Sequence, residues 1–261
     1  MKDKKKLRQK IRQAVCQMYE EVSTHPHLPF HFPVGKTAAE VLGYPKDVLN
    51  KIPPYCLESF AGVAYHFKTN PIGPGDTVLD IGSGSGTDLL IAGILTGKKG
   101  KVSGIDITDA MIAKAKKGVK TNGLANITII KADAENLPFK TQTFDVVISN
   151  GVINLIPDKK KVFGEIFRVL KPNGIFNFAD IVLGKAISEK SRQDPQLWAE
   201  CIVGATQEVW YIEMIKQSGF EDIEVIERVN YFDFSPSQNT KEVANQYKAH
   251  SIIIKAKKGG E

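Results

Sequence analysis

The chain has 261 residues, of which 42% are hydrophobic and 25% are charged, and this ordinary composition excludes collagen-like, low-complexity and disordered proteins. No stretch provides the roughly 18 uncharged apolar residues of a membrane span, since the most apolar candidate, residues 174–187, contains Asp180 and Lys185. The formal net charge of +6 resides in the first 12 residues, which hold seven Lys and Arg against Asp3 alone, so the rest of the chain is neutral.

The first feature of the chain is its basic N-terminal arm, MKDKKKLRQKIR. No apolar stretch follows these charges, so the arm is not a secretory signal, and we expect a cytoplasmic protein with no membrane partner. A basic run can dock RNA or protein, but it is more often a solvated helix face. We therefore expect a small-molecule partner and keep an RNA or protein partner as the alternative.

Residues 1–70 are predicted to form a helical cap that has no sheet of its own. The Pro- and His-rich segment HPHLPFHFP must be a loop, and AAEVLGY and PYCLESFAGVAYHF are predicted as two shorter helices after it. Because the cap contains this loop and precedes the main domain, we expect it to act as a lid. Apolar residues at spacings of three and four predict an amphipathic first helix: Leu7, Ile11, Ala14, Val15 and Met18.

Residues 71–261 are predicted to form the main domain, which begins at the loop NPIGPG. Apolar runs typical of strands alternate here with segments of helical periodicity, and such alternation requires a parallel sheet with helices on both faces. The expected strands are TVLDI, KVSGID, NITIIKAD, FDVVISN and GIFNFADIV, and the expected helices are TDLLIAGILTG, TDAMIAKAKKGVKTNG and PDKKKVFGEIFRVLKPNG.

The C-terminal part of this domain is predicted to differ from the alternating part. An insertion at about residues 184–205 precedes the helix EVWYIEMIKQSG and the strands DIEVIERV and AHSIIIKAK. About 18 residues without a strong helix pattern join the two strands, which favours antiparallel pairing. The predicted fold is therefore α/β, with a doubly wound, mostly parallel, seven-stranded, Rossmann-like sheet and the N-terminal helical cap.

A glycine-rich turn, IGSGSGTD, follows the first predicted strand of the main domain and opens its first helix. Glycines at such a turn let a ligand approach the backbone closely. Asp106 ends the second strand 24 residues after Gly82, where a carboxylate can accept hydrogen bonds from ribose hydroxyls. The two features together predict a nucleotide site.

The charge of the turn indicates which nucleotide it binds. Its pattern is G-x-G-x-G, with Thr87 where a dinucleotide pattern has its third glycine, and Asp80 stands two residues before Gly82. A carboxylate at that point would repel a pyrophosphate. S-adenosylmethionine has no phosphate, and its amino group and sulfonium are both cationic. We therefore predict S-adenosylmethionine as the cofactor, with NAD(P) as the lesser alternative.

Five segments of the chain resemble the successive motifs of class I methyltransferases: VLDIGSGSG, GIDIT, KADAENLPF, FDVVISN and FRVLKPNG. The resemblance implies that Asp80 contacts the methionine amino group, directly or through water, and that Asn150 lies where the family presents its acceptor to the methyl group. The family pattern also implies that the loop, the ribose site and the adenine edge are formed by Gly82, Ser83, Gly84, Gly86, Asp106, Ile107, Asp133 and Ala134.

Two segments resemble arsenite methyltransferases in particular: SNGVINLIPDKKKVFGEIFRVLKPNG and WAECIVGA. That pattern has a cysteine directly after the Ser-Asn pair, where this chain has Gly151, and another before the first strand, where SFAGVAYHF has none. Only Cys201 of the expected trio is in place. Because trivalent arsenic is best held by thiolates, the acceptor is predicted to be arsenite or another small molecule, either soft, thiol-bearing or metalloid, or a hydroxylated metabolite.

The three cysteines, Cys16, Cys56 and Cys201, are far apart and form no C-x-x-C pair, which predicts reduced thiols and no structural zinc site. Cys56 could approach the ligand pocket from the cap, whereas Cys16 is expected to be a buried small hydrophobe. The histidines of HPHLPFH have no acidic or thiol partner nearby in the sequence, so we predict no bound metal.

Methyl transfer from a sulfonium is an in-line displacement, which needs alignment of donor and acceptor rather than a metal or a covalent intermediate. The candidate catalytic residues are Asn150, Cys201 and His66. His66 could serve as a general base, although a capping or packing role is the favoured interpretation. A base is needed only for a poorly acidic oxygen or nitrogen acceptor, because a thiolate or trivalent arsenic already has a free lone pair.

Overall fold

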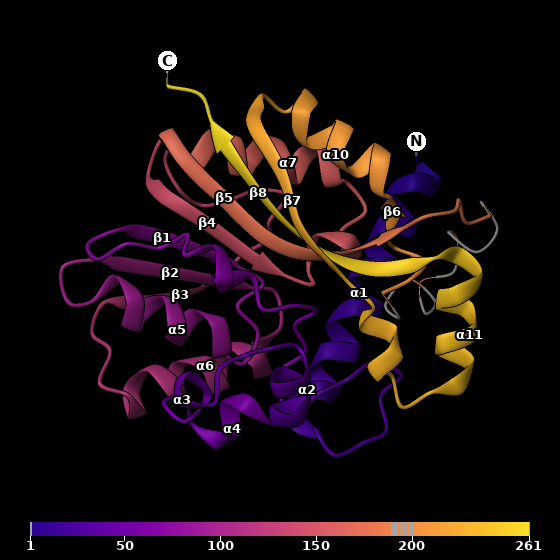
Figure 1. The fold of residues 1–261 in the computed structure, drawn as a ribbon, viewed down its shortest axis with the longest axis horizontal. Coiled ribbons are helices and arrows are strands. Elements are labelled where there is room, and N and C mark those ends of the chain that lie inside the picture. Colours follow the sequence, from indigo (N-terminus) through magenta and orange to yellow (C-terminus); the bar gives the residue numbers. More distant parts are fainter. Residues whose placement is uncertain (1, 189–192, 194, 196–197, 199–200, 261) are drawn as a thin grey trace.

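The computed structural model describes residues 2–260 apart from 189–192, 194, 196–197 and 199–200. One central sheet organises this part of the chain, with strand order β3-β2-β1-β4-β5-β8-β7 and the two-residue β6 paired to β5 off that path (Figure 1). The strands are β1 Thr77–Ile81, β2 Lys101–Asp106, β3 Ile127–Lys131, β4 Phe144–Asn150, β5 Leu170–Leu183, β6 Thr206–Gln207, β7 Phe220–Val229 and β8 Ala249–Lys258.

The sheet is parallel from β3 to β5, and β8 runs antiparallel to both β5 and β7. The doubly wound, mostly parallel sheet of seven main strands is confirmed, as is the antiparallel pairing of the last two strands. The strand order reverses between β1 and β4, and in open α/β sheets ligands bind outside the carboxyl ends of the strands at such a switch point.

Helices cover both faces of the sheet, as the alternating pattern requires. The helices α5 (Thr87–Thr96) and α6 (Asp109–Thr121) lie on one face, and α7 (Lys159–Val169) and α10 (Glu208–Gln217) lie on the other (Figure 1). Neighbouring strand residues accordingly belong to different cores, Val146 to the first and Val147 to the second. Strands buried on both faces therefore appear in the sequence as continuous apolar runs.

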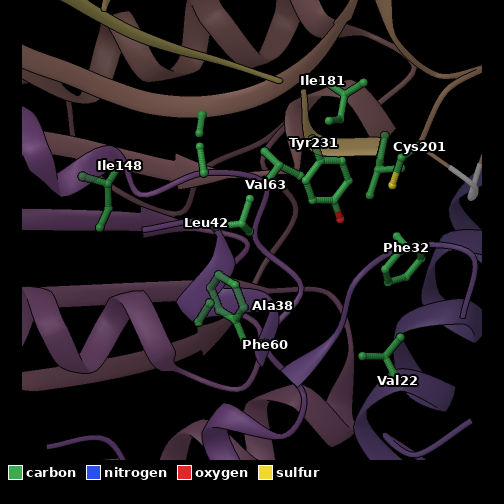
Figure 2. Close-up of a cluster of buried hydrophobic side chains, with 14 of the residues drawn as sticks. Val22, Phe32, Ala38, Leu42, Phe60, Val63, Ile148, Ile181, Cys201 and Tyr231 are labelled. Carbon is green, nitrogen blue, oxygen red and sulfur yellow. The ribbon is translucent and has the colours of Figure 1, made fainter. Parts of the chain in front are cut away.

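The N-terminal helices are α1 (Lys2–Thr24), α2 (Gly35–Val41), α3 (Lys46–Leu49) and α4 (Pro54–Leu57), followed by the short 3₁₀ helix η1 (His66–Thr69). The amphipathic first helix is confirmed, since Ile11, Val15 and Val22 are buried. They belong to the same core cluster as α5 and α6, and Figure 2 shows Phe32 and Phe60 of the cap in one cluster with Ile148 and Ile181 of the sheet. The N-terminal segment and the sheet thus share one core.

The prediction of a helix over residues 54–67 is wrong. Helix α4 ends at Leu57, and residues 58–65 run without regular structure against the end of β4. At Gly62 an added Cβ would lie 2.5 Å from Nδ2 of Asn150, and the Val63 amide donates to Oδ1 of Asn150 over 2.8 Å. Tertiary hydrogen bonds thus replace the helical ones that the apolar spacing favoured.

The segment between the last two strands has no strong helix pattern in the sequence, yet residues 230–248 contain η3 (Tyr231–Phe234) and α11 (Gln238–Tyr247). The Ser237 side chain caps α11 by accepting from the Thr240 amide. This helix buries only Thr240 and Ala244, so its apolar periodicity is too weak to be recognised in the sequence. None of the helices in the described residues is both long and apolar enough to cross a membrane.

Candidate functional site

A cleft of about 1090 Å³, part of it open to solvent, lies at the carboxyl ends of β1, β2 and β4, where the strand order reverses. Its walls come from α1, from the segment after α4, and from the loops that follow β1, β2, β3 and β4. The lining residues are 12, 15, 19, 59–62, 80–85, 87, 88, 105–108, 111, 132–135, 150–152 and 155–157. The predicted cofactor residues converge here, with Gly86 directly beside them in the chain.

The glycine turn that follows β1 lines the cleft. Gly82 and Gly86 have φ of 71° and 98°, a left-handed conformation that glycine adopts without strain. A Cβ on Gly82 would lie only 2.3 Å from Cγ2 of Val152, whereas a Cβ on Gly84 would meet nothing closer than 4.0 Å. The close approach at Gly82 therefore brings the loop after β4 next to the turn, and the backbone at Gly84 stays open to a ligand.

Asp80 provides a buried carboxyl group below this turn. It is 2% exposed, and its Oδ2 has no hydrogen-bond partner in the described residues. Burial, together with nearby Asp88 and Asp106, raises the pKa of Asp80 well above its ordinary value. Ser83 Oγ and Thr87 Oγ1 are likewise buried without a partner. Buried polar atoms are normally satisfied, so this group is matched to a ligand that donates hydrogen bonds and carries positive charge.

Asp106 stands at the end of β2 across from the turn. Its Oδ2 accepts a 2.9 Å hydrogen bond from the Gly84 amide, and its Oδ1 accepts one of 2.8 Å from the Thr108 amide. Burial raises the pKa of Asp106, while these hydrogen bonds lower it. The carboxylate thus connects the turn to the loop after β2 while lining the cleft beside Ile107.

Helix α1 forms one wall of the cleft. Arg12 forms an ion pair with Asp133, and its NH2 lies 3.8 Å from Oε2 of Glu135. Arg12, Val15 and Tyr19 all line the cleft. Asp133, predicted at the adenine edge together with the buried Ala134, is therefore already paired with the N-terminal segment.

Asn150 lines the cleft, but its side-chain amide makes several contacts within the chain. Oδ1 accepts from the Val63 amide, and Nδ2 donates to the Ala64 carbonyl and to Tyr44 Oη, both over 3.0 Å, and to Oδ2 of Asp88 over 2.9 Å. These contacts position the segment after α4 and the start of α5 relative to β4.

Asp88 is the site residue that the sequence analysis missed. Besides Asn150, it accepts a 2.7 Å hydrogen bond from Tyr44 Oη, and Nε2 of His66 lies 3.3 Å from its Oδ2. As the second residue of α5, it has the sequence signature of an ordinary acidic helix start. Only its buried hydrogen-bond partners distinguish Asp88 from an ordinary acidic residue at the start of a helix.

His66 lies behind the cleft rather than on its surface. The side chain is fully buried, Nδ1 lies 3.1 Å from Nδ2 of Asn177, and the residue does not belong to the cleft lining. The structure therefore places His66 with Asp88 and Asn177, in the packing role that the sequence analysis favoured.

The three thiols do not gather in the cleft. Cys56 faces α6, where a Cβ on Gly118 would lie 2.6 Å from its Sγ, and burial raises its pKa to about 12. The expectation that Cys56 approaches the ligand pocket is wrong, since its side chain packs on that helix. Cys16 on α1 is half-buried, and Cys201 is 3% exposed and outside the cleft lining. Figure 2 shows Cys201 in the buried cluster beside Tyr231.

Cys201 contacts Tyr19, whose hydroxyl lies 3.9 Å from Sγ. Tyr19 lines the cleft, whereas Cys201 does not. Within the described part of the chain, no group of three His, Cys, Asp or Glu side chains is placed to hold a metal ion.

A buried polar network fixes the loop after β4. Asp180 on β5 accepts from the Asn154 amide over 2.8 Å and from the Tyr211 hydroxyl, and burial raises its pKa to about 6. Lys159 Nζ donates to the carbonyls of Asn154 and Gly204, both over 2.8 Å. The loop after β4 is thereby joined to the end of the insertion.

Comparison with known proteins places the chain among methyltransferases. A family model described as "Methyltransferase domain" matches residues 72–247. The arsenite methyltransferase of Halobacterium salinarum is 34% identical over 185 residues, which cover 71% of this chain and 47% of that protein. The human arsenite methyltransferase is 39% identical over 137 residues, covering 49% of this chain and 36% of that protein. The chain thus spans about half the length, or less, of these curated relatives.

Two solved structures are similar to this one. The arsenic(III) S-adenosylmethionine methyltransferase CrArsM of Chlamydomonas reinhardtii aligns with a TM-score of 0.63 at 31% identity, covering 87% of this chain and 74% of that one. Phosphoethanolamine N-methyltransferase 2 of Haemonchus contortus, in complex with S-adenosyl-L-methionine, aligns with a TM-score of 0.59 at 25% identity, covering 74% of this chain and 51% of that one.

Proposed function

The chain belongs to the methyltransferase domain family, and we propose that it transfers a methyl group to a small acceptor with a soft nucleophilic atom. S-adenosylmethionine is the cofactor of this family. It supplies, when bound, a methyl group on a positively charged sulfur. The observation that carries the proposal is the unpartnered Asp80 carboxyl below an open glycine turn, in a cleft that lies where the family model matches.

The residues of the cleft fit this cofactor and not a dinucleotide. Asp80, Asp88 and Asp106 place three carboxyl groups around the turn, and a cation bound among them is stabilised by the ionised form of Asp80. The same groups would repel a pyrophosphate. We assign Asp80 to the methionine amino group and Asp106 to the ribose hydroxyls, with Ile107, Asp133 and Ala134 around the adenine.

We also propose that residues 1–70 act as a lid. Three residues of α1 line the cleft, and Arg12 pairs with Asp133 on the opposite wall. A helix held in this way excludes water from the reacting centre when the cleft is filled. Its buried apolar face supports the closed position.

The proposal of a soft acceptor is supported by the names of the relatives and by the chemistry of the cleft. Several curated relatives are named arsenite methyltransferases, and a soft atom with a free lone pair requires no general base. The side chain first considered as a base, His66, packs behind the cleft. Catalysis then rests on positioning the acceptor in line with the methyl group.

The alternative of an RNA or protein target bound by the basic arm has less support. Arg8 pairs with Asp158 at 3.0 Å and Arg12 pairs with Asp133, so two basic residues of the arm contact the rim and wall of the chain's own cleft. A salt-dependent mobility shift with tRNA would favour this alternative.

The proposed function is tested with S-adenosylmethionine labelled in its methyl group and a panel of soft acceptors that includes arsenite with a thiol reductant. Mass spectrometry should detect a labelled methylated acceptor together with S-adenosylhomocysteine. Calorimetry should detect binding of S-adenosylhomocysteine. A protein that binds no S-adenosylhomocysteine and methylates no acceptor would contradict the proposal.

A further inference from the structure

The cleft has two chemically different halves. The glycine turn and the ends of β2 and β3 form the half that we assign to the cofactor. The other half, which we name the acceptor wall, adjoins the end of β4 and is covered by α1 and the segment after α4. The acceptor wall contains Val15, Tyr19, Phe60, Val152, Leu155 and Ile156, and the same elements also contribute Arg12, Ser59 and Asn150.

The acceptor wall is mostly apolar. Arg12 pairs with Asp133, Ser59 bonds to the Val22 carbonyl and to Lys114, and Asn150 bonds to Asp88 and to the Val63 amide.

The fourth polar group of the wall is a hydroxyl. Tyr19 carries that hydroxyl, and burial, with a smaller effect from Cys201, raises its pKa well above the ordinary tyrosine value. Tyr19 therefore stays neutral and does not accept a proton from an acceptor. The carboxyl groups nearby already accept hydrogen bonds, Asp88 from Tyr44 and Asn150 and Asp106 from the Gly84 amide. Among the described residues of this wall, none is a general base.

An acceptor at this wall must therefore bring its own lone pair at neutral pH. A thiol does so, because a few per cent of an ordinary thiol is thiolate at pH 7 and the thiolate is intrinsically very nucleophilic. An alcohol or an amine of ordinary basicity would need a base to remove its proton. The wall thus favours sulfur, or its heavier analogue selenium, over the oxygen of an alcohol and the protonated nitrogen of an alkylamine.

The positions of the three cysteines argue against a site in which the protein binds a metalloid. Trivalent arsenic is a soft centre that prefers several thiolate ligands. The chain has three cysteines in all. Cys56 packs on α6, Sγ of Cys201 lies 3.9 Å from the Tyr19 hydroxyl, and none of the three cysteines lines the cleft. The acceptor wall consequently presents hydrocarbon, not sulfur, to its ligand.

We propose that the acceptor is the thiol of a small molecule with an uncharged, apolar body. This inference rests on the proposed function and names its substrate class. The thiol loses its proton to water, and the resulting sulfur lone pair forms the new bond to the methyl carbon. The bond between that carbon and the sulfonium breaks, and its electron pair remains on the departing sulfur. The products are a methyl thioether and S-adenosylhomocysteine.

The test compares four probes at equal concentration: phenylmethanethiol, benzyl alcohol, 2-mercaptoethanesulfonate and arsenite. Phenylmethanethiol should give its methyl thioether, with kcat/KM rising as pH approaches the pKa of the thiol. Benzyl alcohol should give no product, and the charged thiol should react roughly tenfold more slowly or worse, since its body cannot use the apolar wall. Methylation of the alcohol or of arsenite in preference to phenylmethanethiol would overturn the inference.

Binding of S-adenosylhomocysteine, measured by calorimetry, separates the two levels of failure. If the protein binds this product and methylates arsenite but no thiol, the inference fails while the proposed function stands. If it binds the product and methylates none of the probes, the inference fails as well. If it does not bind the product, the proposed function fails.

A pair of variants tests the wall directly. Ile156→Glu adds a carboxylate to the acceptor wall at a half-buried position, and Val209→Glu adds one on α10, where the side chain is 73% exposed. Ile156→Glu should lower kcat/KM for phenylmethanethiol by about tenfold or more, because an apolar contact is lost and the thiolate is repelled. Both variants should keep the parental affinity for S-adenosylhomocysteine. Equal kcat/KM in the two variants would overturn the assignment of the wall.

Discussion

Nδ2 of Asn150 donates a 2.9 Å hydrogen bond to Oδ2 of Asp88, and this contact joins the end of β4 to the first turn of α5. Tyr44 completes the arrangement by accepting from Asn150 and donating to Asp88. The three side chains connect the cap to two elements of the sheet domain. Asn150 thus has the geometry of a positioning residue.

We therefore expect Asn150→Ala to destabilise the fold. The substitution leaves the Val63 amide without its partner and removes one partner each from the Tyr44 hydroxyl and the Asp88 carboxylate, at a cost of about 1–3 kcal/mol in the free energy of unfolding. Urea denaturation measures this change. Asn122→Ala, which removes only an exposed hydrogen bond to the Lys51 carbonyl, is the matched control and should change stability by less. Equal stability of the two variants would contradict the positioning role.

Asp106→Ala is expected to weaken binding of both S-adenosylmethionine and S-adenosylhomocysteine by about 1–3 kcal/mol, through loss of charge-assisted hydrogen bonds. Calorimetry measures the affinities, and NADH should show no binding to the parent protein. Asp109→Ala, at an exposed carboxylate paired with Lys131, is the control and should bind normally. Tight binding of NADH would show that the cofactor assignment is wrong.

We expect Asp80 to lose a proton when the cofactor binds. Its raised pKa keeps it protonated in the free protein at pH values where an ordinary aspartate is ionised. A bound cation favours the carboxylate, so affinity for S-adenosylmethionine should increase with pH until the raised pKa is passed. Calorimetry in buffers of different ionisation heat counts the released protons, and Asp80→Asn should abolish the release. Equal release from both proteins would contradict this assignment.

The same residue should affect stability in the opposite direction. Because the pKa of Asp80 is raised on folding, the native protein binds more protons than the unfolded chain between the two pKa values. Its contribution to the free energy of unfolding is therefore full below the ordinary aspartate pKa and declines as pH rises towards the raised one. Urea denaturation over this interval should show a shallower decline for Asp80→Asn. Parallel pH profiles for the two proteins would rule out this linkage.

Loss of the Arg12 ion pair is expected to open the lid more often. Arg12→Ala removes the contact with Asp133, and an exposed ion pair contributes about 0–1 kcal/mol, so dissociation of S-adenosylhomocysteine should quicken up to about fivefold. Stopped-flow fluorescence measures the dissociation rate. Lys36→Ala, which removes an ion pair within α2, is the control and should dissociate at the parental rate. Identical rates in the two variants would argue against the lid.

Arsenite with a thiol reductant is expected to give no methylarsenic, because Cys201 is 3% exposed and lies outside the cleft lining. Liquid chromatography with mass spectrometry detects this product. If methylarsenic is formed and Cys201→Ser abolishes it while affinity for S-adenosylhomocysteine is kept, Cys201 is an arsenic ligand and the thiol acceptor is contradicted.

Local patterns in the sequence determined the strands and the glycine turn. β1, β2 and β4 begin and end where the sequence predicts, because strands buried on both faces are mostly apolar runs bounded by polar residues and turns. The turn between β1 and α5 depends on glycine at positive φ, a property that one residue type supplies by itself. For the same reason Asp80 and Asp106, defined by their distance from that turn, could be predicted as residues of the cleft.

Only the tertiary structure decided which side chains meet across the chain. Residues 58–65 have helical spacing, yet their backbone bonds to Asn150, which is more than 80 residues away. Asp88 became the centre of a buried network, and the cysteines packed apart, through contacts with distant elements. Side-chain periodicity reports which face of a helix or strand is buried. It does not report which distant residue that face contacts. The acceptor wall is formed by residues that lie far apart in the sequence, so only the tertiary structure shows it.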